Sequence, residues 1–431
     1  MSAPLRIALA GLGTVGAGTL ELLRRNADTI AGRAGRSIEV VAVSARDRKK
    51  KRDIDVKGPR WFDDAAAMAV SPDIDVVVEL IGGSEGVARA TVEAALDAGR
   101  PVVTANKALL AHHGTALAKR AEKHGVALGF EASVAGGIPI LKVLREGLAA
   151  NRVARIYGIL NGTCNYILTK MRDERRDFAD VLAEAQKLGY AEADPGFDID
   201  GIDAAHKLAI LASVAFGTAV DLKGIQVDGI RHVSALDIAF AAELGYSIKL
   251  LGLARPTEHG LEQRVHPCMV PKAAPIAHVD GVFNAVVIEG DAVGRMMIEG
   301  RGAGAEPTAS AVVADLIDIA AGRRSPGFGV PAESLAAAKS APMARHRGAY
   351  YMRLMVADRP GVIADVAASL RDERVSMQSM LQHGRAAAKE AVPVVITTHE
   401  TEEAAMSRAV ARIADQKSVL EPPRLIRIEN L

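Results

Sequence analysis

Apolar and polar positions in the first part of the chain follow the rhythm of alternating strands and helices. An apolar run at residues 6–10 leads into GLGTVG, and the amphipathic stretch AGTLELLRR follows. Apolar runs at 38–43 and 74–83 and a helical pattern at 87–98 continue this order. Strands that alternate with helices predict β-α-β units around a parallel sheet. We therefore predict an α/β domain over residues 1–130.

The glycine turn GLGTVG stands between the first predicted strand and the first predicted helix. Gly11 permits a tight turn, Gly13 lets a backbone approach a pyrophosphate, and Gly16 lets the helix lie close to the sheet. The helix N-terminus, at Thr14 and Val15, offers backbone N–H groups to phosphates. An ordinary tight turn is the alternative, but the order of strand, glycines and helix favours a Rossmann dinucleotide-binding fold.

The loop after the second predicted strand bears on the choice between NAD and NADP. A carboxylate at this place accepts a hydrogen bond from the ribose 2′-hydroxyl of NAD. This chain instead reads SARDRKKKR at residues 44–52. Arg46 is placed to reach a 2′-phosphate, with Arg48 or Lys50 behind it, and this favours NADP. Asp47 leaves NAD open, and a solvated basic loop is the other interpretation.

The predicted strand PVVTANK ends with Thr104 to Lys107. Ligands of open α/β sheets bind at the carboxyl ends of the strands. Lys107 is therefore either a surface lysine or a residue near the nicotinamide, and its place at a strand end favours the second.

The middle of the chain contains two small-residue segments that follow predicted strands. Residues 131–137 form a Gly- and Ala-rich loop, with Pro139 in the first turn of the next predicted helix, and such loops expose carbonyls that bind a hard cation or a substrate. The strand at 154–160 leads into the predicted turn NGTCNYIL, 161–168. Cys164 in this turn is either a nucleophile or a small buried cysteine, and we favour the structural role.

Five carboxylates crowd ahead of Lys207: Glu192, Asp194, Asp198, Asp200 and Asp203. Asp203 and Lys207 stand four residues apart on a predicted helix, where an exposed ion pair contributes only about 0.2–0.5 kcal/mol. At the mouth of a cleft the same groups can bind an ammonium group and deliver a proton. We expect Asp194, before Pro195, to shape a turn and Asp200 to be a solvated residue at a helix start.

Composition narrows the classes of function. A chain of 431 residues with 49% hydrophobic and 24% charged residues is expected to form about three globular domains. The formal net charge of +1 gives no basic footprint for nucleic acid or an anionic membrane surface. Two cysteines form no disulfide framework, no signal peptide is evident, and the longest apolar run, 208–220, is too short to span a bilayer. We expect a cytoplasmic protein.

The motifs taken together resemble homoserine dehydrogenases. Six of them occur in that family's order over most of residues 5–320: GLGTVG, VTANK, FEASVAGGIPI, NGTCNYIL, GYAEADPGFDIDGIDAAHKLAIL and GRGAGAEPTASAV. The resemblance implies NAD(P)H-dependent interconversion of L-aspartate 4-semialdehyde and L-homoserine, a step toward threonine, isoleucine and methionine. It also implies a homodimer or a dimer of dimers, assembled through the substrate domain.

The same resemblance assigns roles to the charged residues. Lys207 matches the general acid and base, and Lys107 a second essential lysine at the nicotinamide. Glu192 matches the residue that binds the substrate amino group, with Asp198 and Asp203 supporting it. An acid or cation near the carbonyl oxygen would stabilise the negative charge that grows there as hydride arrives.

The resemblance further implies a monovalent cation, most simply sodium, and a second cofactor-binding segment. The cation site is matched by Glu131, Val134, Gly136 and Ile138, largely through backbone oxygens. Gly302 and Glu306 match the segment that returns to the cofactor domain. The predicted domains are residues 1–130, completed by 301–321; the catalytic and dimerisation domain 131–300; a linker 322–348; and a regulatory domain 349–431.

The C-terminal region has a different composition and the order β-α-β-β-α-β, which is typical of a ferredoxin-like fold. It resembles an ACT domain over residues 349–427, in which the turn 358–362 lines an amino-acid site. If it binds a ligand, threonine is the natural hypothesis, whereas a purely structural dimerisation module is the alternative. Pro393 inside a predicted strand marks either an edge strand or a strand start.

Two other functions are alternatives to homoserine dehydrogenase activity. The first is another amino-acid or aldehyde dehydrogenase of the same fold, acting through Cys164. The second is a redox-linked amino-acid sensor without turnover, which leaves the cluster from Glu192 to Lys207 unexplained. The segment before residue 6 is too short to contain a kinase domain, which argues against a fused aspartokinase.

Overall fold

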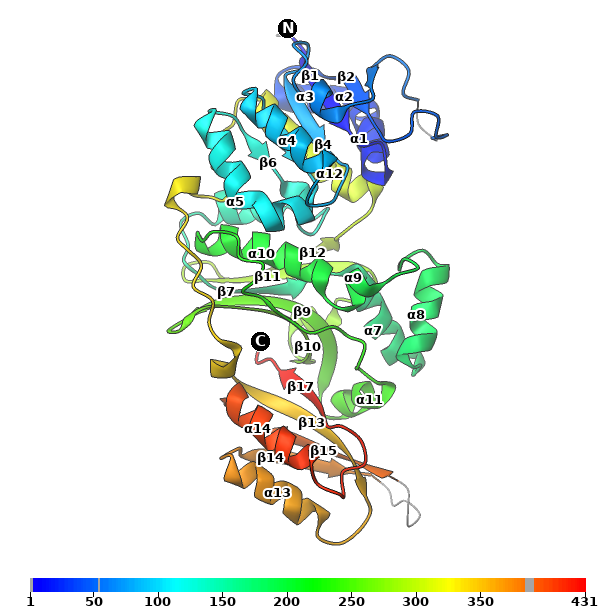
Figure 1. The fold of residues 1–431 in the computed structure, drawn as a ribbon, viewed down its shortest axis with the longest axis vertical. Helices are drawn as coiled ribbons and strands as arrows, with labels where there is room; N and C mark the ends of the chain where they lie inside the picture. The colour runs from blue at the N-terminus through cyan, green and yellow to red at the C-terminus, as the bar shows by residue number, and fades with distance from the viewer. Residues whose placement is uncertain (1–2, 53–54, 384–390) are drawn as a thin grey trace. The chain divides into compact units, whose positions relative to one another are not determined.

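The computed structural model describes residues 3–52, 55–383 and 391–431. The chain divides into two compact units, and Figure 1 labels most of their helices and strands. Unit 1 comprises Met1–Gly162, Asp203–Ile225 and Val282–Ala338. Unit 2 comprises Thr163–Ile202, Gln226–Gly281 and Lys339–Leu431.

The predicted parallel α/β sheet of the N-terminal region is confirmed. Its six strands have the order β3-β2-β1-β4-β5-β6 and are parallel throughout. The strands are β1 (Leu5–Ala10), β2 (Ile38–Ser44), β3 (Arg60–Phe62), β4 (Val76–Glu79), β5 (Val102–Thr104) and β6 (Leu128–Gly129). The helices between them are α1 (Thr14–Arg25), α2 (Ala27–Ala34), α3 (Ala65–Ala69), α4 (Val87–Asp97) and α5 (Lys107–Lys123).

One predicted strand, 74–83, is too long. The strand β4 ends at Glu79, because Gly82 and Gly83 adopt φ values of 87° and 84°. Such left-handed conformations are available to glycine and leave the extended path of a strand.

The glycine turn between β1 and α1 has the packing that the sequence predicts. A Cβ atom at Gly11, whose φ is 107°, would lie 2.4 Å from the Leu80 carbonyl oxygen. A Cβ atom at Gly16 would lie 2.1 Å from the Gly11 carbonyl oxygen. A side chain at Gly13 would meet no atom within 4 Å, so the space beside this residue is open.

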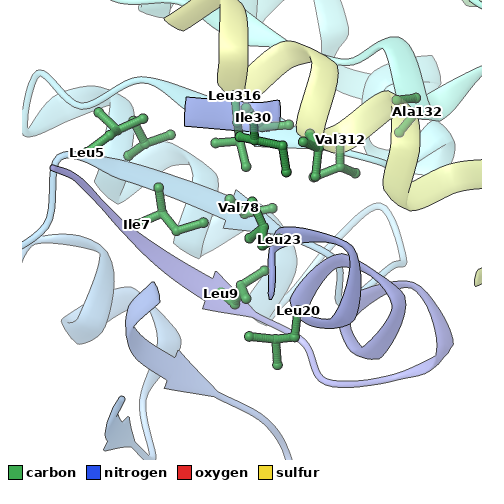
Figure 2. Packing of buried hydrophobic residues seen from close by; sticks show 14 of the residues in the cluster. Leu5, Ile7, Leu9, Leu20, Leu23, Ile30, Val78, Ala132, Val312 and Leu316 are labelled. Atoms are coloured by element: carbon green, nitrogen blue, oxygen red, sulfur yellow. The ribbon is translucent and has the colours of Figure 1, made fainter. Parts of the chain in front are cut away.

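The hydrophobic core of the sheet is completed by a helix from much later in the chain. Helix α12 (Ala305–Ala320) packs beside α1, and a Cβ atom at Gly18 would lie 2.7 Å from the Ala305 carbonyl oxygen. Figure 2 shows Leu9 of β1, Leu20 of α1 and Leu316 of α12 in this core.

The rest of unit 1 carries a second sheet and the helix with Lys207. Strands β7 (Val153–Ile159), β11 (Phe283–Gly290) and β12 (Gly294–Arg301) pair antiparallel. The loop region contains η1 (Glu131–Ser133), α6 (Ile140–Lys142) and the π-helix η2 (Val143–Gly147), and α10 (Ile202–Phe216) follows later in the chain. Pro139 precedes α6 as its N-cap, one position before the predicted first turn. The segment after α12 includes η4 (Ala332–Ser334), and Phe328 packs against Phe130 with ring centroids 5.0 Å apart.

Unit 2 contains helices and a sheet with the strand order β9-β10-β17-β13-β15-β14, with β8 paired to β10. Its elements before the C-terminal region are α7 (Gly162–Glu174), α8 (Phe178–Lys187), α9 (Gly196–Ile199), β8 (Gln226–Val227), α11 (Ala235–Glu243), β9 (Tyr246–Thr257), β10 (Gly260–Pro271) and η3 (Pro275–His278). The segment NGTCNYIL, which we expected to be a turn, forms the first two turns of α7. Residues 164–169 are all buried, so this part of the helix is covered on every side, which favours a helix over an exposed turn.

The predicted β-α-β-β-α-β order of the C-terminal region is confirmed for the described residues. After η5 (Met343–Arg345) come β13 (Arg347–Ala357), α13 (Val362–Asp372), β14 (Met377–Gln382), β15 (Ala391–Thr398), β16 (Thr401–Glu402), α14 (Glu403–Ala414) and β17 (Arg424–Ile428). Glu390, at the predicted start of the third strand, lies outside the described residues. Strand β15 lies between β13 and β14, so Pro393 marks a strand start and not an edge strand. In the described ladder, the pairing of β15 with β14 ends at Val394.

In the part of the chain that the structure describes, no helix is both long and apolar enough to cross a membrane.

Candidate active site

Two lysines from different helices of unit 1 meet at one buried carboxylate. Lys207 Nζ, on α10, lies 2.8 Å from Asp203 Oδ2 and donates to the Leu160 carbonyl oxygen at 2.7 Å. Lys107 Nζ, at the start of α5, lies 3.2 Å from Asp203 Oδ1. Asn161 donates its side-chain amide to Asp203 Oδ2 at 2.8 Å. The structure therefore brings together both lysines that the sequence singles out, with Asp203 between them.

The charge of Asp203 is set by these neighbours. Burial alone would raise the pKa of its carboxyl, but Lys207, Lys107 and the hydrogen bonds from Lys207 and Asn161 hold that pKa well below its usual range. Asp203 is therefore ionised over the whole physiological range, and it is a fixed anion that orients two ammonium groups.

Only part of the hydrogen-bonding capacity of Lys207 is used within the described chain. An ammonium group has three N–H donors, and Leu160 and Asp203 accept two of them. The side chain is 10% exposed, whereas that of Lys107 is 34% exposed. The third N–H of Lys207 is thus available to a polar atom of a bound ligand.

Glu79 is a buried residue that our reading of the sequence missed. Its carboxylate accepts from the backbone N–H groups of Ile81 and Gly82 and from Thr104 Oγ1, at 2.8, 3.0 and 2.6 Å. Asn106, the N-cap of α5, donates to the Gly83 carbonyl oxygen at 2.7 Å. Glu79 is the last residue of β4, at the strand end where ligands bind, and that position is the signal that could have identified it.

The hydrogen bonds around Glu79 also hold the N-terminus of α5, the helix that begins at Lys107. Thr104 Oγ1 also accepts from the Asn106 backbone N–H at 2.9 Å, and Asn106 Oδ1 caps the helix by accepting from the Leu109 N–H at 3.0 Å. The loop after β4 and the N-terminus of α5 are consequently held as one rigid edge of the sheet.

The carboxylates before Lys207 that belong to unit 2 have separate environments. Glu192 is exposed, and Asp198 accepts from Thr163 Oγ1 at 3.3 Å. Asp194 accepts from the Gly196 N–H at 3.1 Å, which confirms its predicted role in a turn. Asp200 has a 43% exposed side chain, as expected of a solvated residue, but it does not stand at a helix start. It is the C-cap of α9 and forms a bidentate ion pair with Arg231.

Cys164 lies fully buried on α7, and its Sγ donates to the Asp198 carbonyl oxygen at 3.2 Å. A thiol that is shielded from solvent and engaged as a donor is typical of a structural cysteine. This geometry agrees with the structural role that the sequence favours.

The cofactor-binding candidates line the carboxyl edge of the parallel sheet. Arg46 and Lys50 are exposed in the loop after β2, and the guanidinium of Arg48 lies 5.7 Å from the centre of the Trp61 ring. Thr14 and Val15 form the first turn of α1 behind the open space at Gly13. Backbone N–H groups at such a helix start suit a pyrophosphate.

The second cofactor candidate segment leads into α12. A Cβ atom at Gly302 would lie 2.1 Å from the side chain of Asn284, so this position requires glycine. Glu306, in the first turn of α12, pairs with Arg25 of α1 at 2.7 Å, and both side chains are at least half exposed.

The proposed cation loop is organised around Glu131. Its carboxylate oxygens accept from the backbone N–H groups of Leu141 and Lys142, both at 2.9 Å. Burial and the nearby carboxylate of Asp315 raise the pKa of Glu131 to about 7, although the Leu141 N–H lowers it. Nearby positive charge favours the ionised form of such a buried carboxyl.

The donors in this loop are hard oxygen atoms. Among the described residues, no group of three or more His, Cys, Asp or Glu side chains is arranged to hold a metal ion. A cation here would instead use Glu131 with the backbone oxygens of Val134, Gly136 and Ile138, and oxygen donors of this kind fit a hard ion. Ala135 and Gly136 both adopt positive φ, 54° and 45°, which turns the backbone sharply at this loop.

Comparisons with known proteins show which family this chain resembles. The sequence model described as homoserine dehydrogenase matches residues 139–317, and that of the homoserine dehydrogenase NAD binding domain matches residues 11–131. A homoserine dehydrogenase of Pseudomonas aeruginosa is 46% identical over 434 residues, which cover 99% of each chain.

Two solved structures extend the comparison. A homoserine dehydrogenase from Thiobacillus denitrificans has 47% identity and a TM-score of 0.94, covering 99% of this chain and 98% of that one. A hyperthermophilic archaeal homoserine dehydrogenase in complex with NADPH has 28% identity and a TM-score of 0.63, covering 73% of this chain and 97% of that one. With a dinucleotide-binding fold, two lysines that share one buried carboxylate, and relatives of full length, the chain belongs to the homoserine dehydrogenase family.

Proposed function

We propose that Lys207 is the general acid and base of the reaction that this enzyme catalyses. The reaction is the reversible hydride transfer between a nicotinamide cofactor and L-aspartate 4-semialdehyde, which gives L-homoserine. The observation that carries the proposal is the position of Lys207 Nζ, which donates to Asp203 and to the Leu160 carbonyl oxygen and has a third N–H that these two described partners leave for a ligand.

The proton is the part of the reaction that the protein supplies. A bound nicotinamide provides the hydride, which adds to the aldehyde carbon and leaves a negative charge on the oxygen. Lys207 donates a hydrogen bond to that oxygen and then the proton that completes the alcohol. In the reverse direction Lys207 takes the proton from the hydroxyl of homoserine.

Asp203 and Lys107 support this step from the protein side. Asp203 holds Lys207 in one orientation, so little rearrangement is needed when charge develops. We propose that Lys107 lies at the nicotinamide, because it starts α5 at the carboxyl edge of β5.

For the substrate, the family resemblance assigns the ammonium group to Glu192, with Asp198 and Asp203 in support. Carboxylates are the natural partners of an α-ammonium group. A role for Glu192 predicts that Glu192→Gln raises the KM for homoserine and leaves cofactor binding unchanged.

We propose NADP as the preferred cofactor and sodium as the ion of the Glu131 loop. The exposed Arg46 and Lys50 after β2 and the archaeal relative solved with NADPH support the first choice. The hard oxygen donors around Glu131 support the second. Binding of sodium would raise the thermal stability in NaCl above that in choline chloride at equal ionic strength.

For the C-terminal region we propose an ACT domain over residues 349–427 that binds threonine near the turn 358–362. We further propose a homodimer or dimer of dimers in the cytoplasm, and the domain division 1–130 with 301–321, 131–300, 322–348 and 349–431. Titration calorimetry with threonine tests the ligand, and sedimentation tests the assembly. A heat signal with another amino acid but not with threonine would show that the domain binds that amino acid and not threonine.

The test of the proposed function is the absorbance of the reduced nicotinamide with purified protein, L-homoserine and either NADP⁺ or NAD⁺ at alkaline pH. We expect reduction that requires homoserine and is faster with NADP⁺. A folded protein that binds the cofactor without turnover would instead support the sensor function, and loss of turnover in a folded Cys164→Ser variant would support a thiol mechanism.

A further inference from the structure

Asn284 of β11 carries a buried amide that has no hydrogen-bond partner within the described parts of the chain. The residue is 1% exposed, and neither its Nδ2 nor its Oδ1 has a hydrogen-bond partner among the described residues. Buried polar side chains in folded proteins are almost always hydrogen-bonded, and an unpaired one destabilises the fold. Both atoms of this amide are therefore expected to meet a group that is not part of the chain.

The amide lies between two segments that belong to the proposed active site. A Cβ atom at Gly302 would lie 2.1 Å from Asn284 Cγ and Nδ2, and a Cβ atom at Gly162 would lie 3.6 Å from Asn284 Oδ1. Gly302 precedes the N-cap of α12, and Asn161, next to Gly162, donates to Asp203. Glycine at both positions lets the two backbones approach the amide.

We propose that Asn284 binds the carboxamide of the nicotinamide ring, an inference that rests on the proposed function. An asparagine amide presents one donor group and one acceptor side by side, and a primary carboxamide presents the complementary pair. The substrate's ammonium group only donates and its carboxylate only accepts, so neither satisfies both atoms. The substrate hydroxyl is already the proposed partner of Lys207.

The consequence is control over the orientation of the ring. A carboxamide held by both of its polar atoms fixes the rotation of the nicotinamide about its glycosidic bond, and with it the face that exchanges hydride. Asn284 is thus a cofactor-positioning residue that the family motifs in this sequence do not mark.

The test compares Asn284→Leu with the unsubstituted protein, first without cofactor. Leucine replaces the amide by an apolar group of similar volume, so we expect the Tm of the cofactor-free protein to stay the same or to rise. The Kd of NADPH, measured by nicotinamide fluorescence, should increase about 10-fold, as expected for the loss of hydrogen bonds. If Asn284→Leu does not fold, Asn284→Ala allows the same comparison of NADPH binding.

A cofactor analogue identifies the group that Asn284 binds. The 3-acetylpyridine analogue of NADPH keeps the carbonyl oxygen but lacks the amide N–H donors, so the difference in Kd between the two proteins should be smaller for the analogue. Equal differences for NADPH and the analogue would overturn the assignment to the carboxamide.

Asn165 provides a matched control, because it is equally buried but donates to the Val279 carbonyl oxygen at 3.0 Å. Asn165→Leu should lower the Tm and leave the Kd of NADPH unchanged. If Asn284→Leu behaves in this same way, Asn284 bonds a structural water and the proposal is wrong. These measurements use cofactor binding alone, so they are independent of whether homoserine is turned over.

Discussion

At the scale of single residues, the proposed chemistry depends on how one buried anion arranges two cations. Asp203 is almost completely buried, and its partners Lys207 and Lys107 come from helices that are about 100 residues apart in sequence. An exposed i,i+4 pair would contribute little. Burial changes this, because charges are less screened by solvent inside the protein and each ammonium group is held in place.

Replacing Lys207 tests its role as acid and base. We expect Lys207→Met to lower kcat by about 10²–10⁴-fold, because the alkoxide oxygen loses its proton donor. The Kd of NADPH should change little. Lys119→Met is the matched control, since Lys119 is an exposed lysine that pairs with Glu333 at 3.0 Å. A Lys207→Met enzyme with near-normal kcat would rule out the acid and base role.

Arg46 is expected to distinguish the two cofactors. Arg46→Ala should weaken NADP about 10- to 100-fold and NAD much less, since a hydrogen bond between charged groups is lost only with the 2′-phosphate. KM values for both cofactors measure this difference. Arg48→Ala, whose side chain packs over Trp61, should have a smaller effect. Equal losses for NADP and NAD in Arg46→Ala would show that Arg46 does not read the phosphate.

At the scale of helices and strands, the two lysine-bearing helices α5 and α10 are also joined by a pair of histidines. The rings of His112 and His206 meet edge to face, with centroids 5.5 Å apart. Burial, the neighbouring His112 and the charge of Lys107 together lower the pKa of His206 to about 4, whereas Asp203 acts in the opposite direction. The two helices are therefore packed through a histidine that is neutral in the folded protein.

This histidine predicts a loss of stability in acid. Between its unfolded pKa of 6.5 and its folded value of about 4, the unfolded chain binds more protons than the folded one. The contribution of His206 to the free energy of unfolding is thus fully present above pH 6.5 and decreases as the pH falls through this window.

We expect His206→Phe to remove this part of the pH dependence, which amounts to an effect on the order of 3 kcal/mol across the window. Urea denaturation of both proteins at several pH values measures it. Identical pH profiles for the two proteins would show that His206 titrates equally in the folded and unfolded states.

At the scale of the whole molecule, the C-terminal region is built into the sheet of unit 2 and is not a loosely attached module. Strand β17 pairs in parallel with β10 through Cys268–Arg427 and Met269–Ile428. The fully buried Arg264 of β10 forms an ion pair with Glu429, just after β17, at 2.5 Å, and with Glu262 at 2.9 Å. A cation buried to this degree requires its counter-charges.

Removing one of these counter-charges is expected to destabilise unit 2. Glu429→Ala should lower the free energy of unfolding by about 3 kcal/mol, because Arg264 is left with incomplete pairing. Chemical denaturation measures this change, and Glu400→Ala, an exposed glutamate of the same region, serves as the control. The double variant Arg264→Met with Glu429→Leu should recover most of the stability. No change in Glu429→Ala would mean that Arg264 finds another counter-charge.

The amino-acid sequence by itself determined the features that depend on neighbouring residues. The alternation of strands and helices in the first 130 residues, the roles of Gly11 and Gly16 in the turn, and the β-α-β-β-α-β order of the C-terminal region all follow from local periodicity and backbone freedom. The motif around Lys207 was equally visible, because its carboxylates stand within one short segment.

Only the tertiary structure decided which distant groups meet. The contact of Lys107 with Asp203 and the network that Glu79 forms with Thr104 join different elements. The amide of Asn284 is buried with no hydrogen-bond partner among the residues that the structure describes. Element lengths also changed where a glycine conformation ended β4 early or where burial made a predicted turn helical. Sequence spacing carries no signal for these features, since they depend on which side chains remain buried and unsatisfied once the chain has packed.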